Sequence, residues 1–223
     1  PSHKIFRLAP LNAGDIEKLA VSCGVNPTDF IKAVNANLST SLIQQPLDAH
    51  LFLEVWEKAV GQGRAPDEVF QSRLQVMHDL VTWRLFGRSE SKDRLNLVIV
   101  RARKAAAKLA AFVVLSGEQD LAVHPFNAGD AINASQILST DVDSWTAPEL
   151  RELLACGLFQ PSIGGRIRFA HREIRDYLAA EYFDESLRAR ANSENTIAPL
   201  FSEGLGRRTI PQSSEHVMAW LAA

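Results

Sequence analysis

A change of hydrophobic period near residue 171 divides the most informative stretch of the chain, residues 166–183, into two predicted elements. Before this point Ile167 and Phe169 alternate with arginines, a pattern typical of a short strand with one solvated face. After it, apolar residues recur at helical spacing, namely Ile174, Tyr177, Leu178 and Tyr182. We therefore expect a strand that runs directly into a helix. His171 lies at the junction, where the N–H groups of a first helical turn favour an anion.

Helical periodicity also predicts most of the first half of the chain. Asn12 has the side chain of a helix cap, and Pro27 suits the first position of the next helix. Pro46 opens the strongest helix of this region, residues 47–60, and a long amphipathic helix is predicted for residues 66–86. A strand and a helical turn are expected at residues 4–8 and 38–43.

The second half alternates between helices and short strands. We expect a long helix at residues 94–116, a short strand at 121–123 and a short helix at 132–138. Two small amphipathic segments are expected at residues 197–201 and 216–221. Thr146 and Glu149 form a capping-box pattern for a further helix, which precedes a hairpin with its turn at residues 162–165. Helix, strand, two helices and hairpin is the order of a winged-helix domain.

The residues around His171 resemble a known family motif. The pattern is aromatic-x-His-Arg-x-hydrophobic-(Arg/Gln)-(Glu/Asp)-(Tyr/Phe)-Leu-Ala-Ala, and it is matched by Phe169, His171, Arg172, Ile174, Arg175, Asp176, Tyr177, Leu178, Ala179 and Ala180. This resembles the end of the winged-helix domain in NACHT-type STAND NTPases. The matching histidine of that family contacts the phosphates of bound ADP and holds the protein closed. The resemblance implies that His171 is a nucleotide-binding residue in a switch element.

Two further segments are similar to landmarks of the same family. Residues 7–11 resemble the exit from the NTPase core, and Gln45-Pro46-Leu47 resembles the lid motif whose proline packs on the adenine. The resemblance implies that Pro46 is a second nucleotide-binding residue. A proline that only opens a helix is the alternative at this position.

The resemblance implies a mainly α fold, in which a helical lid bundle is followed by a winged-helix domain with a small β-hairpin. The chain begins without Met in an apparent strand and stops in an apparent helix, which favours an excised piece of a larger protein. Residues 1–10 are expected to be the exit of an NTPase core, and residues 11–63 the helical lid. Residues 64–101 would form linking helices, residues 102–187 the winged-helix domain, and residues 188–223 the start of a helical repeat region.

Composition excludes several classes of protein. The 223 residues are 46% hydrophobic with a net charge of −2, so we expect a globular chain without bulk affinity for nucleic acid. The longest apolar run, residues 105–115, contains Lys108 and is too short to span a membrane. Cys23 and Cys156 lack metal spacing and fit the reducing cytoplasm, where we expect the protein.

The motifs of a complete enzyme are missing from the sequence. There is no Gly-x-x-x-x-Gly-Lys-(Ser/Thr) loop, no apolar strand that ends in paired acids, no metal-ligand spacing and no nucleophile motif. We therefore expect no catalytic residue, metal or cofactor in these residues. In the resembling family an upstream NTPase core binds ADP or ATP with Mg, and activation can involve assembly of identical copies.

Three functions remain open. The first is a regulatory, nucleotide-dependent switch in a NACHT/STAND-type ATPase, a class that in bacteria often serves in signalling or anti-phage defence. The second is a winged-helix DNA-binding regulator, which the arginines of the wing region favour and which Glu149 and Glu152 of the would-be recognition helix disfavour. The third is a helical protein-interaction scaffold.

Overall fold

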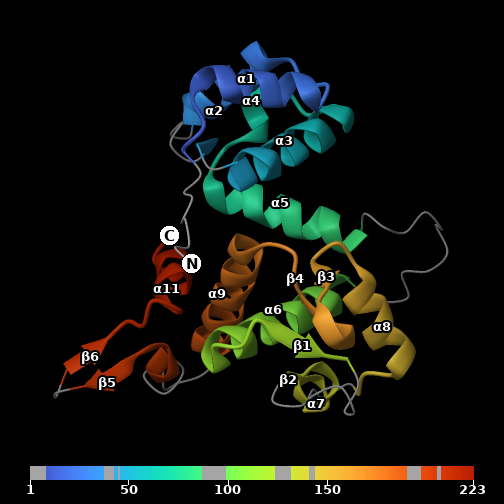
Figure 1. The fold of residues 1–223 in the computed structure, drawn as a ribbon, viewed down its shortest axis with the longest axis vertical. Coiled ribbons are helices and arrows are strands. Elements are labelled where there is room, and N and C mark those ends of the chain that lie inside the picture. Colours follow the sequence, from blue (N-terminus) through green and yellow to red (C-terminus); the bar gives the residue numbers. More distant parts are fainter. Residues whose placement is uncertain are drawn as a thin grey trace, which may run out of the picture. The chain divides into compact units, whose positions relative to one another are not determined.

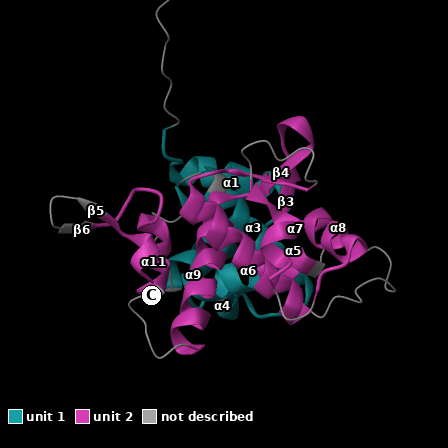
Figure 2. Cartoon of the chain, turned by 90° about the horizontal axis from the view of Figure 1, so that it is seen from below, with its two compact units in different colours: residues 1–80 teal, residues 81–223 magenta. Residues whose placement is uncertain are grey.

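The computed structural model describes residues 9–37, 43–44, 46–86, 99–123, 132–140, 144–189, 197–204 and 207–223. The predicted strand at residues 4–8 and all but the last residue of the predicted turn at residues 38–43 lie outside these ranges. The described residues are mainly helical and include two small sheets (Figure 1). The chain divides into two compact units, residues 1–80 and 81–223, coloured teal and magenta in Figure 2. The expectation of a mainly α fold is confirmed.

Unit 1 is built from short helices around an aromatic cluster. Its helices are α1 (Ala13–Ser22), α2 (Pro27–Asn37), α3 (Pro46–Gly61), α4 (Pro66–Val69) and the first part of α5 (Arg73–Phe86). Four rings meet with centroids 5.5–5.8 Å apart, those of Phe30, Phe52, Trp56 and Phe70. Because each ring buries a large apolar area, this cluster supplies much of the core of unit 1.

The predicted helix starts of unit 1 are confirmed. The Asn12 side chain accepts a hydrogen bond from the main-chain N–H of Asp15 at 3.0 Å, and the Asp15 side chain accepts one from the N–H of Asn12 at 3.2 Å. This reciprocal pair satisfies two N–H groups at the start of α1. Pro27 and Pro46 are the first residues of α2 and α3, where the missing N–H is not needed.

The prediction of one helix over residues 66–86 is wrong. Phe70 leaves the helical conformation, with φ −114° and ψ 69°, and α4 and α5 are separate helices. Its side chain is fully buried in the aromatic cluster. The hydroxyl of Ser72 then accepts a hydrogen bond from the N–H of Gln75 at 3.1 Å and caps the new helix.

In unit 2, two long helices pack along each other. They are α6 (Ile99–Ser116) and α9 (Arg172–Ala189), and α11 (Glu215–Leu221) packs on α9 (Figure 1). The buried face of α6 is rich in alanine, at positions 102, 105, 106, 107, 110 and 111. Small side chains let the neighbouring backbone approach closely. On the other side of α9 the rings of Tyr177 and Trp220 meet edge to face at 5.4 Å.

Unit 2 also contains a four-stranded sheet in the order β2-β1-β4-β3. Its strands are β1 (Asp120–Ala122), β2 (Ile132–Asn133), β3 (Phe159–Pro161) and β4 (Arg166–Phe169). Strand β4 is antiparallel to both β1 and β3, whereas β2 is parallel to β1. Two helices, α7 (Ala134–Leu138) and α8 (Ala147–Ala155), lie in the chain between β2 and β3. The predicted helix at residues 132–138 therefore begins two residues too early, because Ile132 and Asn133 pair with β1.

The predicted hairpin is confirmed, with its connection at residues 162–165. This connection contains a 3-10 turn, Ile163–Gly165, in which Gly164 and Gly165 both have φ of 72°. Glycine adopts this left-handed conformation without the steric penalty of a Cβ. A second hairpin, β5 (Ser202–Gly204) and β6 (Arg207–Thr209), was not predicted.

Candidate functional site

The strand-to-helix junction predicted around His171 is present in unit 2. Strand β4 ends at Phe169, the N–H of Ala170 donates to the carbonyl of Leu158 at 2.9 Å, and α9 begins at Arg172. His171 lies between them, half-buried, and its carbonyl accepts the hydrogen bond of the Arg175 N–H at 3.2 Å. His171 therefore occupies the capping position of α9, where the helix dipole favours an anion.

A buried carboxylate holds the first turns of α9. Asp176 has no exposed surface, and its Oδ1 accepts hydrogen bonds from Nε and Nη2 of Arg175 at 2.8 and 2.6 Å. Its Oδ2 accepts a hydrogen bond from Nε of Arg172 at 3.3 Å. The sequence analysis did not identify this cluster. The four-residue spacing of Arg172 and Asp176 on a helix is the feature that could have indicated it.

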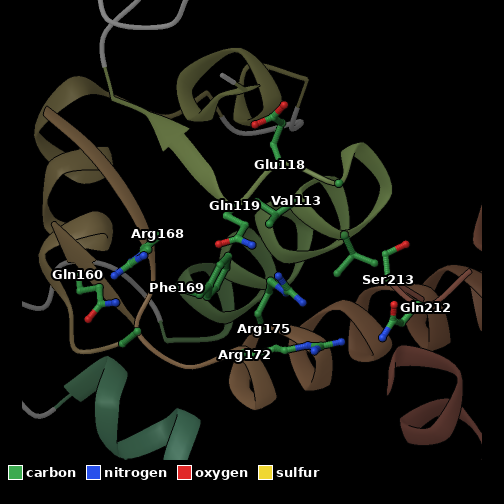
Figure 3. A pocket seen from close by; sticks show the side chains of 13 residues that line it. Val113, Glu118, Gln119, Gln160, Arg168, Phe169, Arg172, Arg175, Gln212 and Ser213 are labelled. Carbon is green, nitrogen blue, oxygen red and sulfur yellow. The ribbon is translucent and has the colours of Figure 1, made fainter. Parts of the chain in front are cut away.

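Next to this cluster lies a pocket of about 520 Å³ that carries three guanidinium groups. We call it the arginine pocket. In Figure 3, Arg168 and Gln160 lie on the left, Gln212 and Ser213 on the right, and Arg172 and Arg175 between them. The wall is completed by Val113, Val114, Gly117, Glu118, Gln119, Phe169 and Ala170. His171 is not among the lining residues, so the pocket opens on another side of the same junction.

The lining of the arginine pocket carries more cationic than anionic side chains. Arg168, Arg172 and Arg175 line it together with one carboxylate, the exposed Glu118, whereas Asp176 is buried beside two of the arginines and Asp120 on β1 lies across the strand pair from Arg168. The side chains of Arg172 and Arg175 are 52% and 17% exposed. The N-terminal turn of α9 adds its partial positive charge. The arrangement can therefore hold an anion through several charge-assisted hydrogen bonds.

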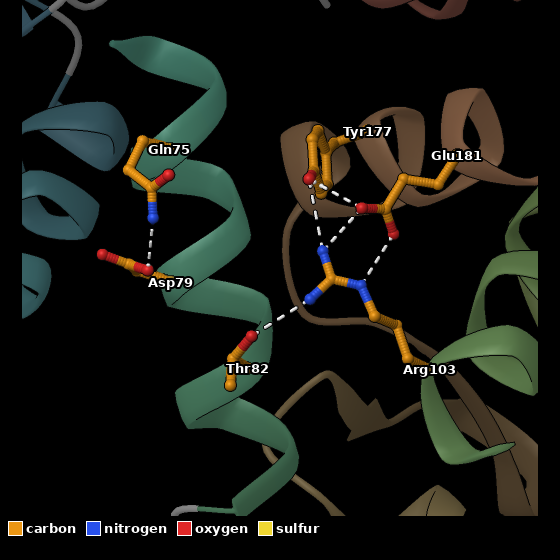
Figure 4. A network of polar contacts seen from close by, with 6 residues as sticks. All are labelled: Gln75, Asp79, Thr82, Arg103, Tyr177 and Glu181. Atoms are coloured by element: carbon orange, nitrogen blue, oxygen red, sulfur yellow. Dashed lines mark hydrogen bonds and ion pairs between the residues drawn. The ribbon is translucent and has the colours of Figure 1, made fainter. Parts of the chain in front are cut away.

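A second polar cluster of unit 2 is structural. Arg103 on α6 donates from Nε to Glu181 on α9 at 2.9 Å, from Nη1 to the hydroxyl of Thr82 at 3.0 Å and from Nη2 to the hydroxyl of Tyr177 at 3.2 Å (Figure 4). Tyr177 also donates to Glu181 at 2.7 Å. Burial and the neighbouring charge of Glu181 raise the pKa of Tyr177, so this hydroxyl stays a hydrogen-bond donor. The network ties α6 to α9.

The second predicted site residue, Pro46, is the half-buried first residue of α3 in unit 1. His171 belongs to unit 2, and each residue is placed within its own unit. Because Pro46 is the first residue of α3, its role in opening this helix is confirmed. The contacts of Pro46 and of His171 with a nucleotide stay predictions.

An acidic residue, Glu149, lies at the start of α8, the helix that would read DNA in a winged-helix regulator. Nη1 of Arg101 pairs with Oε1 of Glu149 at 2.7 Å, and the same guanidinium lies 4.4 Å from the ring centre of Trp145. Hydrogen bonds from the main chain and the hydroxyl of Thr146, followed by that of Arg101, lower the pKa of Glu149 to about 2. The capping box of Thr146 and Glu149 is thereby confirmed. Glu149 stays negatively charged at the start of α8.

No cluster of three or more His, Cys, Asp and Glu side chains suited to a metal ion occurs among the described residues. No helix in these parts of the chain combines the length and the apolar character needed to cross a membrane.

Comparison with known proteins does not assign the chain to a family. No protein-family model, no curated protein and no solved structure matches the chain.

Proposed function

We propose that this chain is a non-catalytic regulatory part of a NACHT/STAND-type ATPase and acts as a nucleotide-dependent switch. The observation that carries the proposal is the junction at His171. A strand runs directly into a helix there, as the ten-position motif requires, and the histidine occupies the capping position of α9. The motif is thus supported by the local structure on which its chemistry depends.

The arrangement of unit 2 supports a winged-helix identity for residues 102–187. Helix α6, strand β1, helices α7 and α8, and strands β3 and β4 follow one another along the chain. The last strand, β4, lies between the first and the second of these three strands and is antiparallel to both. That is the order of elements and strands in a winged helix, to which this chain adds β2 at the edge of the sheet.

In the proposed switch, the imidazole of His171 donates a hydrogen bond to a phosphate oxygen of ADP, and the dipole of α9 adds a favourable field. Pro46 packs on the adenine from the lid. The phosphate-binding loop and the Mg site belong to the NTPase core that the family places upstream. Because His171 is one of several contacts that hold the nucleotide in this proposal, loss of this contact shifts the balance between closed and open states.

We expect His171→Ala to weaken ADP retention about 10- to 100-fold in the protein that contains the NTPase core. A hydrogen bond to a charged group contributes roughly 1.5–3 kcal/mol, which corresponds to that range. The measurement is the dissociation rate of a fluorescent ADP analogue, with effector output or assembly as a second readout. The fold should persist, because the residue precedes the helix and does not lie in its apolar face.

His216→Ala is the matched control for this experiment. It removes the same side chain from an exposed position on α11 of the same unit. Unchanged ADP retention in His171→Ala, or equal losses in both variants, would make His171 a structural cap and reject the assignment.

The second candidate is a winged-helix DNA-binding regulator, which the exposed arginines 168 and 172 favour. Against it, Glu149 is charged at the start of α8, the helix that would read the bases. A carboxylate in that position repels the DNA backbone.

We therefore expect only weak, salt-sensitive association with duplex DNA, with a Kd above about 10 μM at physiological salt. Fluorescence anisotropy with random-sequence and selected duplexes measures it, and a repeat at about 50 mM salt gives the electrostatic part. Nanomolar binding to one sequence would establish the DNA-binding function instead.

A further inference from the structure

We propose that the arginine pocket binds a small phosphate-bearing molecule at a site separate from His171. This inference concerns unit 2 alone and does not depend on the nucleotide switch. It rests on the pocket's cationic groups, on its amide side chains and on its concave shape.

Arg168 is the cationic group most available to a ligand. It is exposed on β4, lines the pocket, and forms no ion pair with any carboxylate in the described part of the chain. Its cross-strand neighbour on β3 is Gln160, a neutral side chain that also lines the pocket. The cross-strand neighbour of Arg168 on β1 is Asp120, which does not line the pocket. A guanidinium presents five N–H donors in a planar fork that matches the geometry of a phosphate.

Asp176 orients Arg175 through two short hydrogen bonds and contacts the half-exposed Arg172 through one longer hydrogen bond. The carboxylate engages Nε of Arg172, and Nε and Nη2 of Arg175, which leaves further donors of both guanidinium groups for a ligand. Because Asp176 is fully buried, it fixes these side chains from beneath and takes up no room in the pocket. Binding of a ligand therefore costs less arginine side-chain entropy than it would if the arginines were flexible.

The rest of the wall suits an organic part of the ligand. Gln119, Gln160 and Gln212 supply amide donors and acceptors, and Phe169 supplies an apolar wall. The volume of about 520 Å³ lies within the range of pockets for small molecules. Both the charges and the size therefore fit a metabolite-sized phosphate compound.

The shape argues against a nucleic-acid backbone as the occupant. The arginines are gathered in a hollow formed by the end of α6, strands β3 and β4, the start of α9 and residues 212–213. A duplex instead needs a row of cations along an open surface, with phosphates spaced along each strand. The pocket thus favours one compact anion.

Titration of the 223-residue chain with inorganic pyrophosphate by isothermal calorimetry tests the inference. We expect a Kd of about 0.1–1 mM at low salt, because two or three charge-assisted hydrogen bonds form in a solvated pocket. Arg168→Gln should weaken binding about tenfold. Gln160→Glu should weaken it by a similar factor, since the new carboxylate lies directly across the strand pair from Arg168.

Two variants serve as controls. Arg188→Gln makes the same charge change on α9, about 24 Å along the helix from Arg172. Its side chain is 80% exposed, and we expect the Kd to change less than twofold. His171→Ala should also keep the affinity of the arginine pocket, whatever its effect on ADP, and this separates the present inference from the proposed switch.

Four results would overturn the inference. They are no heat of binding at 10 mM pyrophosphate, equal weakening in Arg168→Gln and Arg188→Gln, loss of pyrophosphate binding in His171→Ala, and displacement of pyrophosphate by micromolar duplex DNA. The third would assign the arginines to the nucleotide site, and the fourth would assign them to a nucleic-acid surface.

Discussion

Asp176→Asn is expected to lower the free energy of unfolding of unit 2 by roughly 3 kcal/mol. The wild-type carboxylate has no exposed surface and accepts hydrogen bonds from both Arg172 and Arg175. Removal of one partner of a buried ion pair typically costs about 3–5 kcal/mol, because the other charge stays buried without compensation. Here the loss should lie at the low end of that range, since the side chain of Arg172 is half exposed and can turn to water.

Urea unfolding followed by circular dichroism measures this loss, and hydrogen exchange of the α9 amides locates it in unit 2. Asp184→Asn is the matched control, because Asp184 is a half-exposed carboxylate on the same helix that pairs with the exposed Arg188. That change should cost less than about 1 kcal/mol. Equal effects of the two substitutions would show that the buried cluster does not stabilise the start of α9.

The elements that were predicted correctly are those with local determinants. Capping side chains lie at Asn12 and Thr146, Pro27 and Pro46 open α2 and α3, and a pair of glycines forms the turn of the first hairpin. In each case a residue next to the boundary provides the hydrogen bond or the backbone conformation that starts or ends the element. Such determinants act over three or four residues and can be read from the sequence alone.

The wrong predictions concern elements whose boundaries are set by tertiary contacts. Residues 66–86 have continuous helical periodicity, yet burial of Phe70 among three other rings outweighs the local preference for one helix. Strand β2 forms because Ile132 and Asn133 pair with β1, which lies ten residues earlier. Neither contact leaves a pattern within a short window of sequence.

The same difference between local and tertiary determinants separates the two candidate sites. The junction at His171 was predicted, because the change of period and the motif both lie within one continuous stretch. The arginine pocket was not, because its wall comes from the end of α6, the first hairpin, the start of α9 and residues 212–213. Arginines 168, 172 and 175 were visible in the sequence, but only the fold shows that they face one cavity.

Leu178→Ala is expected to destabilise unit 2 by about 2–5 kcal/mol. Leu178 is fully buried in the middle part of α9, within the helix that packs on both α6 and α11. Truncation of a buried leucine removes its transfer free energy and leaves a cavity that close-packed neighbours fill only in part. The alanine-rich face of α6 offers little flexible side chain to fill it, so the loss should exceed the low end of this range.

Leu115→Ala is the control, since Leu115 on α6 is 40% exposed and the same truncation there should cost less than about 1 kcal/mol. The comparison uses urea unfolding of both variants, followed by circular dichroism. If Leu178→Ala were as stable as Leu115→Ala, the contacts of α9 would not be a main part of the core of unit 2. The predicted large loss would instead show that the packing of α9 stabilises unit 2. His171 directly precedes this helix, and the arginine pocket is lined by residues of its first turn.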